Sequence, residues 1–165
     1  MPPPALHHVA FACKDLEATH HFYAEVLGFP LVHAEIAEQG DGYLKHVFYD
    51  LGDGSCIAFF HLNRVGEPEE YDTAISTGLG LPIWVNHVAI RADHARVDDV
   101  NARLKQHGLE RLMRLDHGWS KSTYLVDPNG IMVEFCVDDP GFEPDPAEAL
   151  RVLRQPVAAE AGGTA

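Results

Sequence analysis

The sequence predicts an α+β protein made of two βαβββ modules whose strands form a curved mixed sheet. The first observation is an internal repeat. HHVAFACKDL (7–16) matches NHVAIRADHA (86–95), 79 residues further on, and DGSCIAFF (53–60) matches NGIMVEFC (129–136), 76 residues further on. Two matching pairs at nearly the same offset indicate a duplicated unit. The second observation is that each half contains one helix-like segment among runs of alternating apolar residues.

The first half contains one strand, one helix and three further strands. Asp15 is a suitable helix N-cap, the following segment is apolar on one side, and Gly28 is suited to end the helix. The predicted elements are a strand over 6–13, a helix up to Leu27, and strands near 29–37, 43–51 and 55–62.

The second half repeats this order. Val97, Val100 and Leu104 share one side of its helix, and Gly108 follows the end of that helix. The predicted elements are a strand over 84–92, a helix over 95–107, strands near 110–116, 120–127 and 131–137, and a short tail helix over 146–154. The chain therefore divides into a first module (1–62), a linker (63–83), a second module (84–138) and a C-terminal tail with a short helix (139–165).

Composition narrows the classes of function. Twelve Lys and Arg stand against 25 Asp and Glu, for a formal charge of −13, which argues against nucleic-acid or membrane-surface binding. The N-terminal residues lack the pattern of a signal peptide, and no apolar run is long enough to span a membrane. The three cysteines are widely separated and form no zinc-binding pattern. We therefore expect a cytoplasmic protein with reduced thiols.

Glu134 is the most informative residue of the last predicted strand. Ile131, Val133 and Phe135 occupy one face of that strand, and Glu134 lies on the other between Met132 and Cys136. A buried carboxylate without a partner would cost several kcal/mol or would hold a proton.

The duplicated first strands offer partners for Glu134. His8 and His87 occupy equivalent places in the two copies, and each is followed on its own face by a small Ala residue. A divalent cation held by His8, His87 and Glu134 would remove the cost of burial. Two imidazoles and one carboxylate form the facial triad of non-haem Fe(II) enzymes, and the same set suits Mn(II) and does not exclude Zn(II).

His61 is the nearest rival ligand among the other histidines. The register that aligns Gly54 with Gly130 places Ala58, rather than His61, opposite Glu134 in the repeat. Because Ala58 cannot bind a metal, the predicted site has three protein ligands and is open for catalysis.

The chain resembles the vicinal oxygen chelate superfamily over about residues 5–138. This superfamily includes glyoxalase I, bleomycin-resistance proteins, fosfomycin-modifying transferases and extradiol dioxygenases. The matching segments are LHHVAFACKDLEATHHFYAEVLGF, NHVAI and YLVDPNGIMVEF. The resemblance implies paired βαβββ modules around a metal-binding cleft, with His8, His87 and Glu134 as the ligands.

The segment from His117 to Glu134 is similar to the extradiol dioxygenase signature. Leu115 and Thr123 depart from the usual residues at their places in that pattern. The resemblance implies that His117 acts as an acid/base or oxygen-stabilising group and that Tyr124 hydrogen-bonds a substrate hydroxyl. The predicted reaction is ring cleavage of a catecholic or similar small diol with dioxygen, at an Fe(II) centre, in a protein expected to be a homodimer.

Three alternatives remain open at this stage. A glyoxalase-like lyase usually has a fourth protein ligand at the place of Ala58, whereas a fosfomycin-type thiol transferase uses three ligands. A metal-free protein that binds an antibiotic or another small molecule would need no His8/His87/Glu134 set. The sequence does not decide whether the modules pair within one chain or between two chains.

Overall fold

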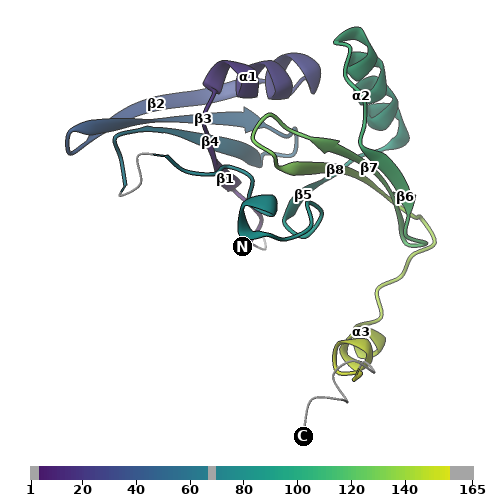
Figure 1. Cartoon of the computed structure of the whole chain (residues 1–165). Helices are drawn as coiled ribbons and strands as arrows, with labels where there is room; N and C mark the ends of the chain where they lie inside the picture. The colour runs from purple at the N-terminus through teal and green to yellow at the C-terminus, as the bar shows by residue number, and fades with distance from the viewer. Residues whose placement is uncertain (1–3, 67–69, 157–165) are drawn as a thin grey trace, which may run out of the picture.

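The computed structural model describes residues 4–66 and 70–156, and it confirms the predicted order βαβββ in each half (Figure 1). The first half contains β1 (His8–Cys13), α1 (Leu16–His20), the π-helical segment η1 (His21–Val26), β2 (Leu31–Gln39), β3 (Gly42–Asp50) and β4 (Cys56–Asn63). The second half contains β5 (His87–Arg91), α2 (His94–Gln106), β6 (Met113–Asp116), β7 (Ser120–Val126) and β8 (Met132–Asp138). A short 3-10 helix, η2 (Thr77–Leu79), lies between the halves, and α3 (Pro146–Leu153) follows them.

Each half forms a four-stranded mixed sheet. The strand orders are β1-β4-β3-β2 and β5-β8-β7-β6, with β1/β4 and β5/β8 parallel and the other neighbours antiparallel. Ala10 pairs with Ala58 in the first sheet, and Ala89 pairs with Glu134 in the second. Ala58 thus occupies the place in the first sheet that Glu134 occupies in the second, as the repeat predicted.

The helix ends follow from local chemistry. The Asp15 carboxylate accepts a hydrogen bond from the Ala18 backbone N–H at 2.9 Å, and the Asp93 carboxylate accepts one from the Arg96 N–H at 2.7 Å. Gly28 follows the first helix with φ +75°, a left-handed conformation that favours glycine.

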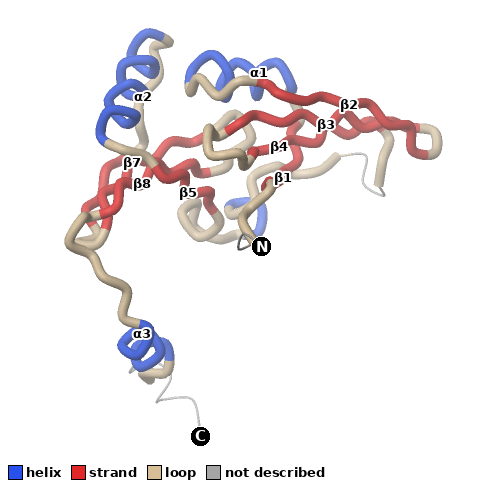
Figure 2. Tube along the Cα trace, turned by 180° about the vertical axis from the view of Figure 1, so that it is seen from behind, coloured by secondary structure: helices blue, strands red, loops and turns tan. Residues whose placement is uncertain are grey.

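The helices of both halves cover the same side of the two sheets (Figure 2). Buried apolar side chains from the two halves join in one core on this side. Phe29 stacks on Phe135 with ring centroids 6.2 Å apart, and the Arg96 guanidinium donates to the Leu27 carbonyl at 2.7 Å. Among the described elements, no α-helix covers the opposite faces of the sheets, and the short 3-10 helix η2 lies on that side. The strand registers place His8, His87 and Glu134 on those faces.

The C-terminal helix α3 stands away from the two sheets (Figures 1 and 2). Its residues are all exposed, and the Asp145 side chain caps its first turn. Among the described residues, no helix combines the length and the apolar character that crossing a bilayer requires.

Candidate functional site

His87 and Glu134 come together because β5 and β8 are parallel neighbours. His87 pairs with Met132 and Ala89 pairs with Glu134, so all four residues share the face opposite the core residues Val133 and Phe135. The His87 Nε2 atom lies 3.1 Å from a carboxylate oxygen of Glu134. The strand pattern therefore delivers two of the three predicted ligands to one place.

The Glu134 carboxylate is buried, with 5% of the residue exposed, and it is held on both sides. The Ser122 hydroxyl on the neighbouring strand β7 donates a short hydrogen bond to one carboxylate oxygen, and His87 faces the other. Ser122 was not predicted as a site residue, although it alternates with Tyr124 and therefore faces the same way.

The orientation of the His87 ring has a chemical consequence. Its Nδ1 atom lies 2.9 Å from the Trp84 backbone carbonyl, and a carbonyl can only accept, so Nδ1 carries a proton. In a neutral imidazole, Nε2 then presents a lone pair to the Glu134 carboxylate. Two electron-pair donors facing each other at 3.1 Å suit either a protonated His87 or a cation between the two groups. A histidine that donates its second N–H to a backbone carbonyl is also typical of metal ligands.

His117 and Tyr124 form a second pair beside these groups. The Tyr124 hydroxyl lies 2.9 Å from the His117 Nε2, and Tyr124 pairs with Glu134 across β7 and β8. The rings of Tyr124 and His87 are 6.5 Å apart. Burial raises the pKa of the Tyr124 hydroxyl, and the charge of Glu134 acts in the same direction, so the phenol stays protonated at neutral pH.

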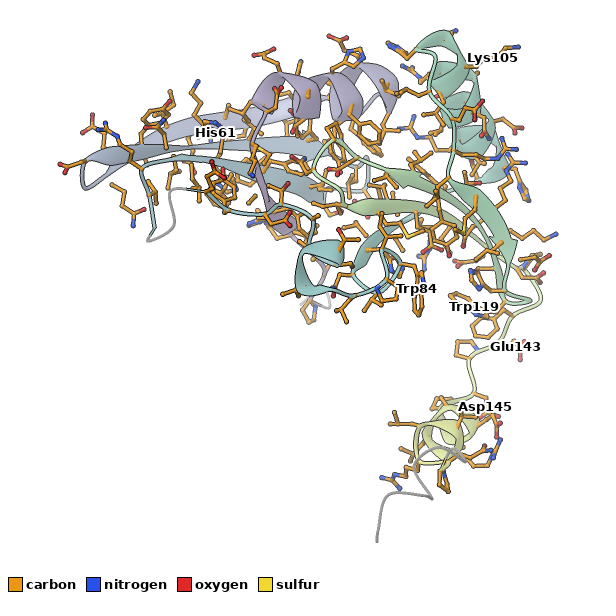
Figure 3. All side chains as sticks on the ribbon, viewed as in Figure 1. His61, Trp84, Lys105, Trp119, Glu143 and Asp145 are labelled. Atoms are coloured by element: carbon orange, nitrogen blue, oxygen red, sulfur yellow. The ribbon has the colours of Figure 1, made fainter. Side chains whose placement is uncertain are left out.

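Aromatic side chains lie at the edges of this cluster (Figure 3). Trp84 precedes β5, and Trp119 lies at the end of the second sheet near the segment that leads to α3. The ring centroids of His117 and Trp119 are 6.0 Å apart, and those of Trp119 and Phe142 are 5.8 Å apart. Trp84 and Trp119 are both largely exposed, so this side of the second sheet is open.

His8 lies on the other sheet, away from His87 and Glu134. Its neighbours are His7, with the two Nδ1 atoms 2.7 Å apart, and the rings of His46 and Phe48 at 6.2 and 5.4 Å. Within residues 4–66 and 70–156 of one chain, no three or more His, Cys, Asp or Glu side chains are grouped closely enough to hold a metal ion. The single chain therefore unites His87, Glu134, His117 and Tyr124 but does not bring His8 to them.

His61 lies on the opposite face of β4 from Ala58. It pairs with Cys13 of β1 and Lys45 of β3, and its ring Nδ1 is buried with no hydrogen-bond partner among the described residues. His61 therefore faces the helix side of the sheet and does not share a face with His8.

A profile of the glyoxalase/bleomycin resistance protein/dioxygenase superfamily matches residues 5–135 of the chain. The chain belongs to this superfamily. Members of the glyoxalase/dioxygenase superfamily are typically enzymes that act on small molecules, and they commonly use a divalent metal.

One curated relative is the Bacillus subtilis protein MhqA, which is provisionally named a ring-cleaving dioxygenase. It is 31% identical over 144 residues, which cover 86% of this chain and 42% of MhqA. The chain thus spans less than half the length of this superfamily relative.

Solved structures of the superfamily share the fold. A lactoylglutathione lyase from Agrobacterium tumefaciens is 24% identical, with a TM-score of 0.57 over 86% of this chain and 100% of the lyase. A fosfomycin resistance protein from Listeria monocytogenes is 19% identical, with a TM-score of 0.55 over 84% of this chain and 97% of that protein. At these identities the likeness concerns the fold alone.

Proposed function

We propose that this chain is a metal-dependent enzyme of the glyoxalase/dioxygenase superfamily that cleaves the ring of a catecholic or similar small diol with dioxygen. The observation that carries the proposal is the buried Glu134 carboxylate facing the Nε2 atom of His87 at 3.1 Å. The name of MhqA supports ring cleavage as the reaction class. Because this chain spans less than half of MhqA, we assign that activity to this chain only as part of the proposal.

His87 and Glu134 fit a divalent ion, and Fe(II) is the ion that we favour. Both groups are fixed by neighbours that are not ligands, namely the Trp84 carbonyl and the Ser122 hydroxyl. When bound, such an ion supplies chelation of the diol and activation of dioxygen. Ala58, at the place equivalent to Glu134, adds no fourth ligand, which favours an open site over the four-ligand site of glyoxalase-like lyases.

His117 and Tyr124 are proposed to bind the substrate and to exchange protons with it. The Tyr124 phenol is protonated at neutral pH, so it can donate a hydrogen bond to a substrate hydroxyl or its oxyanion. The His117 Nε2 lies 2.9 Å from the same phenol oxygen, so the two groups can exchange a proton. Burial of Tyr124 and Glu134 limits the water that reaches these atoms.

We propose that His8 joins His87 and Glu134 through a second copy of the chain. His8 is exposed on the face of the first sheet away from α1, and His87 is exposed on the corresponding face of the second. Large apolar side chains on or beside these faces are also exposed, including Met113, Leu115 and Trp84. Covering them against a second copy would remove apolar surface from water, in keeping with the predicted homodimer.

The proposal is tested by metal content and oxygen consumption in the same preparations. The protein is loaded anaerobically with Fe(II), Mn(II) or Zn(II) in separate samples. Bound metal is then quantified, and oxygen uptake is followed with a panel of methyl- and carboxyl-substituted catechols. Glu134→Ala should lose the metal and all oxygen uptake, whereas Glu38→Gln, an exposed carboxylate on β2, should match the parent protein.

Each outcome distinguishes the alternatives. Catechol-dependent oxygen uptake that requires the metal supports the dioxygenase. A protein that binds metal stoichiometrically but consumes no oxygen with any diol would instead be a lyase or a transferase. A protein that takes up none of the three metals would be a metal-free binding protein.

A further inference from the structure

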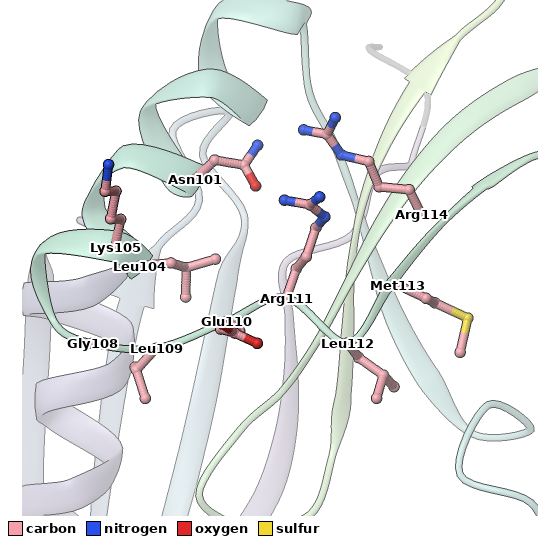
Figure 4. Close-up of a pocket in the computed structure, with 10 residues that line it drawn as sticks. All are labelled: Asn101, Leu104, Lys105, Gly108, Leu109, Glu110, Arg111, Leu112, Met113 and Arg114. Atoms are coloured by element: carbon pink, nitrogen blue, oxygen red, sulfur yellow. The ribbon is translucent and has the colours of Figure 1, made fainter.

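A groove of about 830 Å³ lies between the C-terminal half of α2 and the segment that leads into β6 (Figure 4). Asn101, Leu104 and Lys105 of the helix line one side, and Arg111, Leu112 and Arg114 line the other. Arg114 pairs with Thr123, so it lies on the face of the second sheet opposite Tyr124 and Glu134. The groove is therefore separate from the candidate metal site.

The charge of this groove is opposite to that of the molecule. The chain carries only 12 Lys and Arg against 25 Asp and Glu, yet Lys105, Arg111 and Arg114 all line this one groove. Glu110 is the only carboxylate among its lining residues in the described chain, which leaves an excess of two positive charges.

Within the described residues, these three cations also differ from other arginines of the second half in having no protein partner. Arg91, Arg96 and Arg103 each pair with a carboxylate at 3.0 to 3.1 Å. In the part of the chain that the structure describes, the side chains of Lys105, Arg111 and Arg114 form neither an ion pair nor a hydrogen bond. Figure 4 shows the guanidinium groups of Arg111 and Arg114 directed into the same space beside the Asn101 amide.

Two guanidinium groups that share a space repel each other unless an anion lies between them. Arg is also the side chain best suited to hold a phosphate or carboxylate group, because its planar N–H donors match the oxygens of either group. The groove also has apolar lining residues, namely Leu104, which is buried, and Leu109 and Leu112, which are partly exposed. A ligand that satisfies both parts has an anionic head and an apolar body.

We propose that this groove binds a small amphipathic anion, with its phosphate or carboxylate head between Arg111 and Arg114 and its apolar body along Leu104, Leu109 and Leu112. The Asn101 amide nitrogen donates one hydrogen to the Val97 carbonyl at 2.7 Å and can donate the other to the head, and the Lys105 ammonium supplies a further donor. The proposal does not depend on the metal site or on the reaction catalysed there.

The test is binding of octyl phosphate and of octanoate to the full chain, measured by calorimetry at low ionic strength and below micelle formation. We expect saturable binding of at least one of them, and the stronger one identifies the preferred head group. Octanol is the neutral probe and should bind more weakly than either anion, because it offers no charge to the guanidinium groups. In amide NMR spectra, the shifts should concentrate at residues 101–114.

The double variant Arg111→Gln/Arg114→Gln should weaken anion binding by about tenfold or more, because charge-assisted hydrogen bonds are lost. Arg154→Gln is the control for the loss of a positive charge elsewhere, since it removes an exposed one from the end of α3 and should bind the probe as the parent does. Equal binding by the double variant, binding of octanol as tight as that of the anions, or shifts located elsewhere would overturn the proposal. The NMR mapping uses the parent protein, so the test stands even if the double variant does not fold.

Discussion

At the scale of single residues, the surroundings of Glu134 are unfavourable for stability unless a cation or a proton lies between it and His87. Its carboxylate is buried beside a histidine whose Nδ1 proton is already committed to the Trp84 carbonyl. Without a cation, either an acceptor faces an acceptor or His87 must be protonated. Functional sites commonly contain such unfavourable arrangements, and the surrounding structure holds them in place.

The first prediction follows from this arrangement. In the absence of metal, Glu134→Gln should be as stable as the parent or more stable by about 1 kcal/mol, because the amide can donate to His87 and still accept from Ser122. Added metal should raise the melting temperature of the parent but not that of the variant. Thermal denaturation with and without the ion measures both effects. A variant whose melting temperature still rises with metal would exclude Glu134 as a ligand.

The second prediction concerns Cys13, which is fully buried on β1. Burial raises the pKa of its thiol from 9.0 to about 11. The folded state therefore keeps the proton between these values while the unfolded state loses it. This contribution to stability is complete below pH 9 and falls by roughly 2 to 3 kcal/mol as the pH rises to 11.

Comparison with Cys13→Ala isolates this effect from the titration of the tyrosines, which both proteins share. The free energy of unfolding, measured in urea from pH 8 to 11, should fall more steeply for the parent than for the variant. Parallel curves over this range would show that the thiol does not remain protonated in the folded state.

At the scale of elements, a buried polar network joins the first helix to the turn before β8. The Tyr23 hydroxyl of η1 donates to the Asp127 carboxylate at 3.0 Å, and that carboxylate also accepts from the Ile131 N–H at 2.8 Å and the Asn129 N–H at 2.9 Å. Burial raises the pKa of Asp127, and these hydrogen bonds oppose that change. The turn that Asp127 organises leads directly into the strand that carries Glu134.

The third prediction is that this network stabilises the contact between the halves. Asp127→Asn should lower the free energy of unfolding by about 1 to 2 kcal/mol, because its amide nitrogen cannot accept the hydrogen bond from the Asn129 side chain. Tyr23→Phe should cost about 1 kcal/mol, and the two changes together should cost less than their sum. Asp41→Asn, in the exposed turn between β2 and β3, is the control and should change stability by less than about 0.5 kcal/mol. Strict additivity of the two buried changes would contradict the coupling.

At the scale of the whole molecule, the packing of the halves leaves the predicted ligands on two different sheets. The helices meet on one side, so the faces that carry His8 and His87 are both open to solvent. If two copies associate through these faces, each site takes His8 from one copy and His87 with Glu134 from the other.

The fourth prediction is a complementation that only such shared sites allow. His8→Ala and Glu134→Ala should each lose metal binding when pure. Mixed and refolded together, they should recover about one quarter of the parent's metal content, because half of the dimers are mixed and each mixed dimer has one intact site. Sedimentation should show dimers in every sample. No recovery in mixed dimers would place any complete site within one chain.

The sequence alone determined the duplicated order of elements, the alignment of the two copies and the strand faces of the site residues. These properties follow from local chemistry and from alternation, so the equivalence of Ala58 and Glu134 and the proximity of His87, Glu134 and Tyr124 could be predicted. Strand alternation could also have indicated Ser122, but a serine in a strand carries no chemical signal of its own.

Only the tertiary structure decided where His8 lies relative to His87 and which cations gather beside α2. The first depends on how the two sheets pack through α1, η1, α2 and Phe29, and no periodicity in the sequence encodes that geometry. The second depends on the chain reversing direction after α2, so that the segment leading into β6 lies beside that helix. This reversal brings Lys105, Arg111 and Arg114 to one groove. Contacts between paired strands of one module follow from the alternation of their residues. The position of His8 and the cation groove instead follow from how separate elements pack against each other.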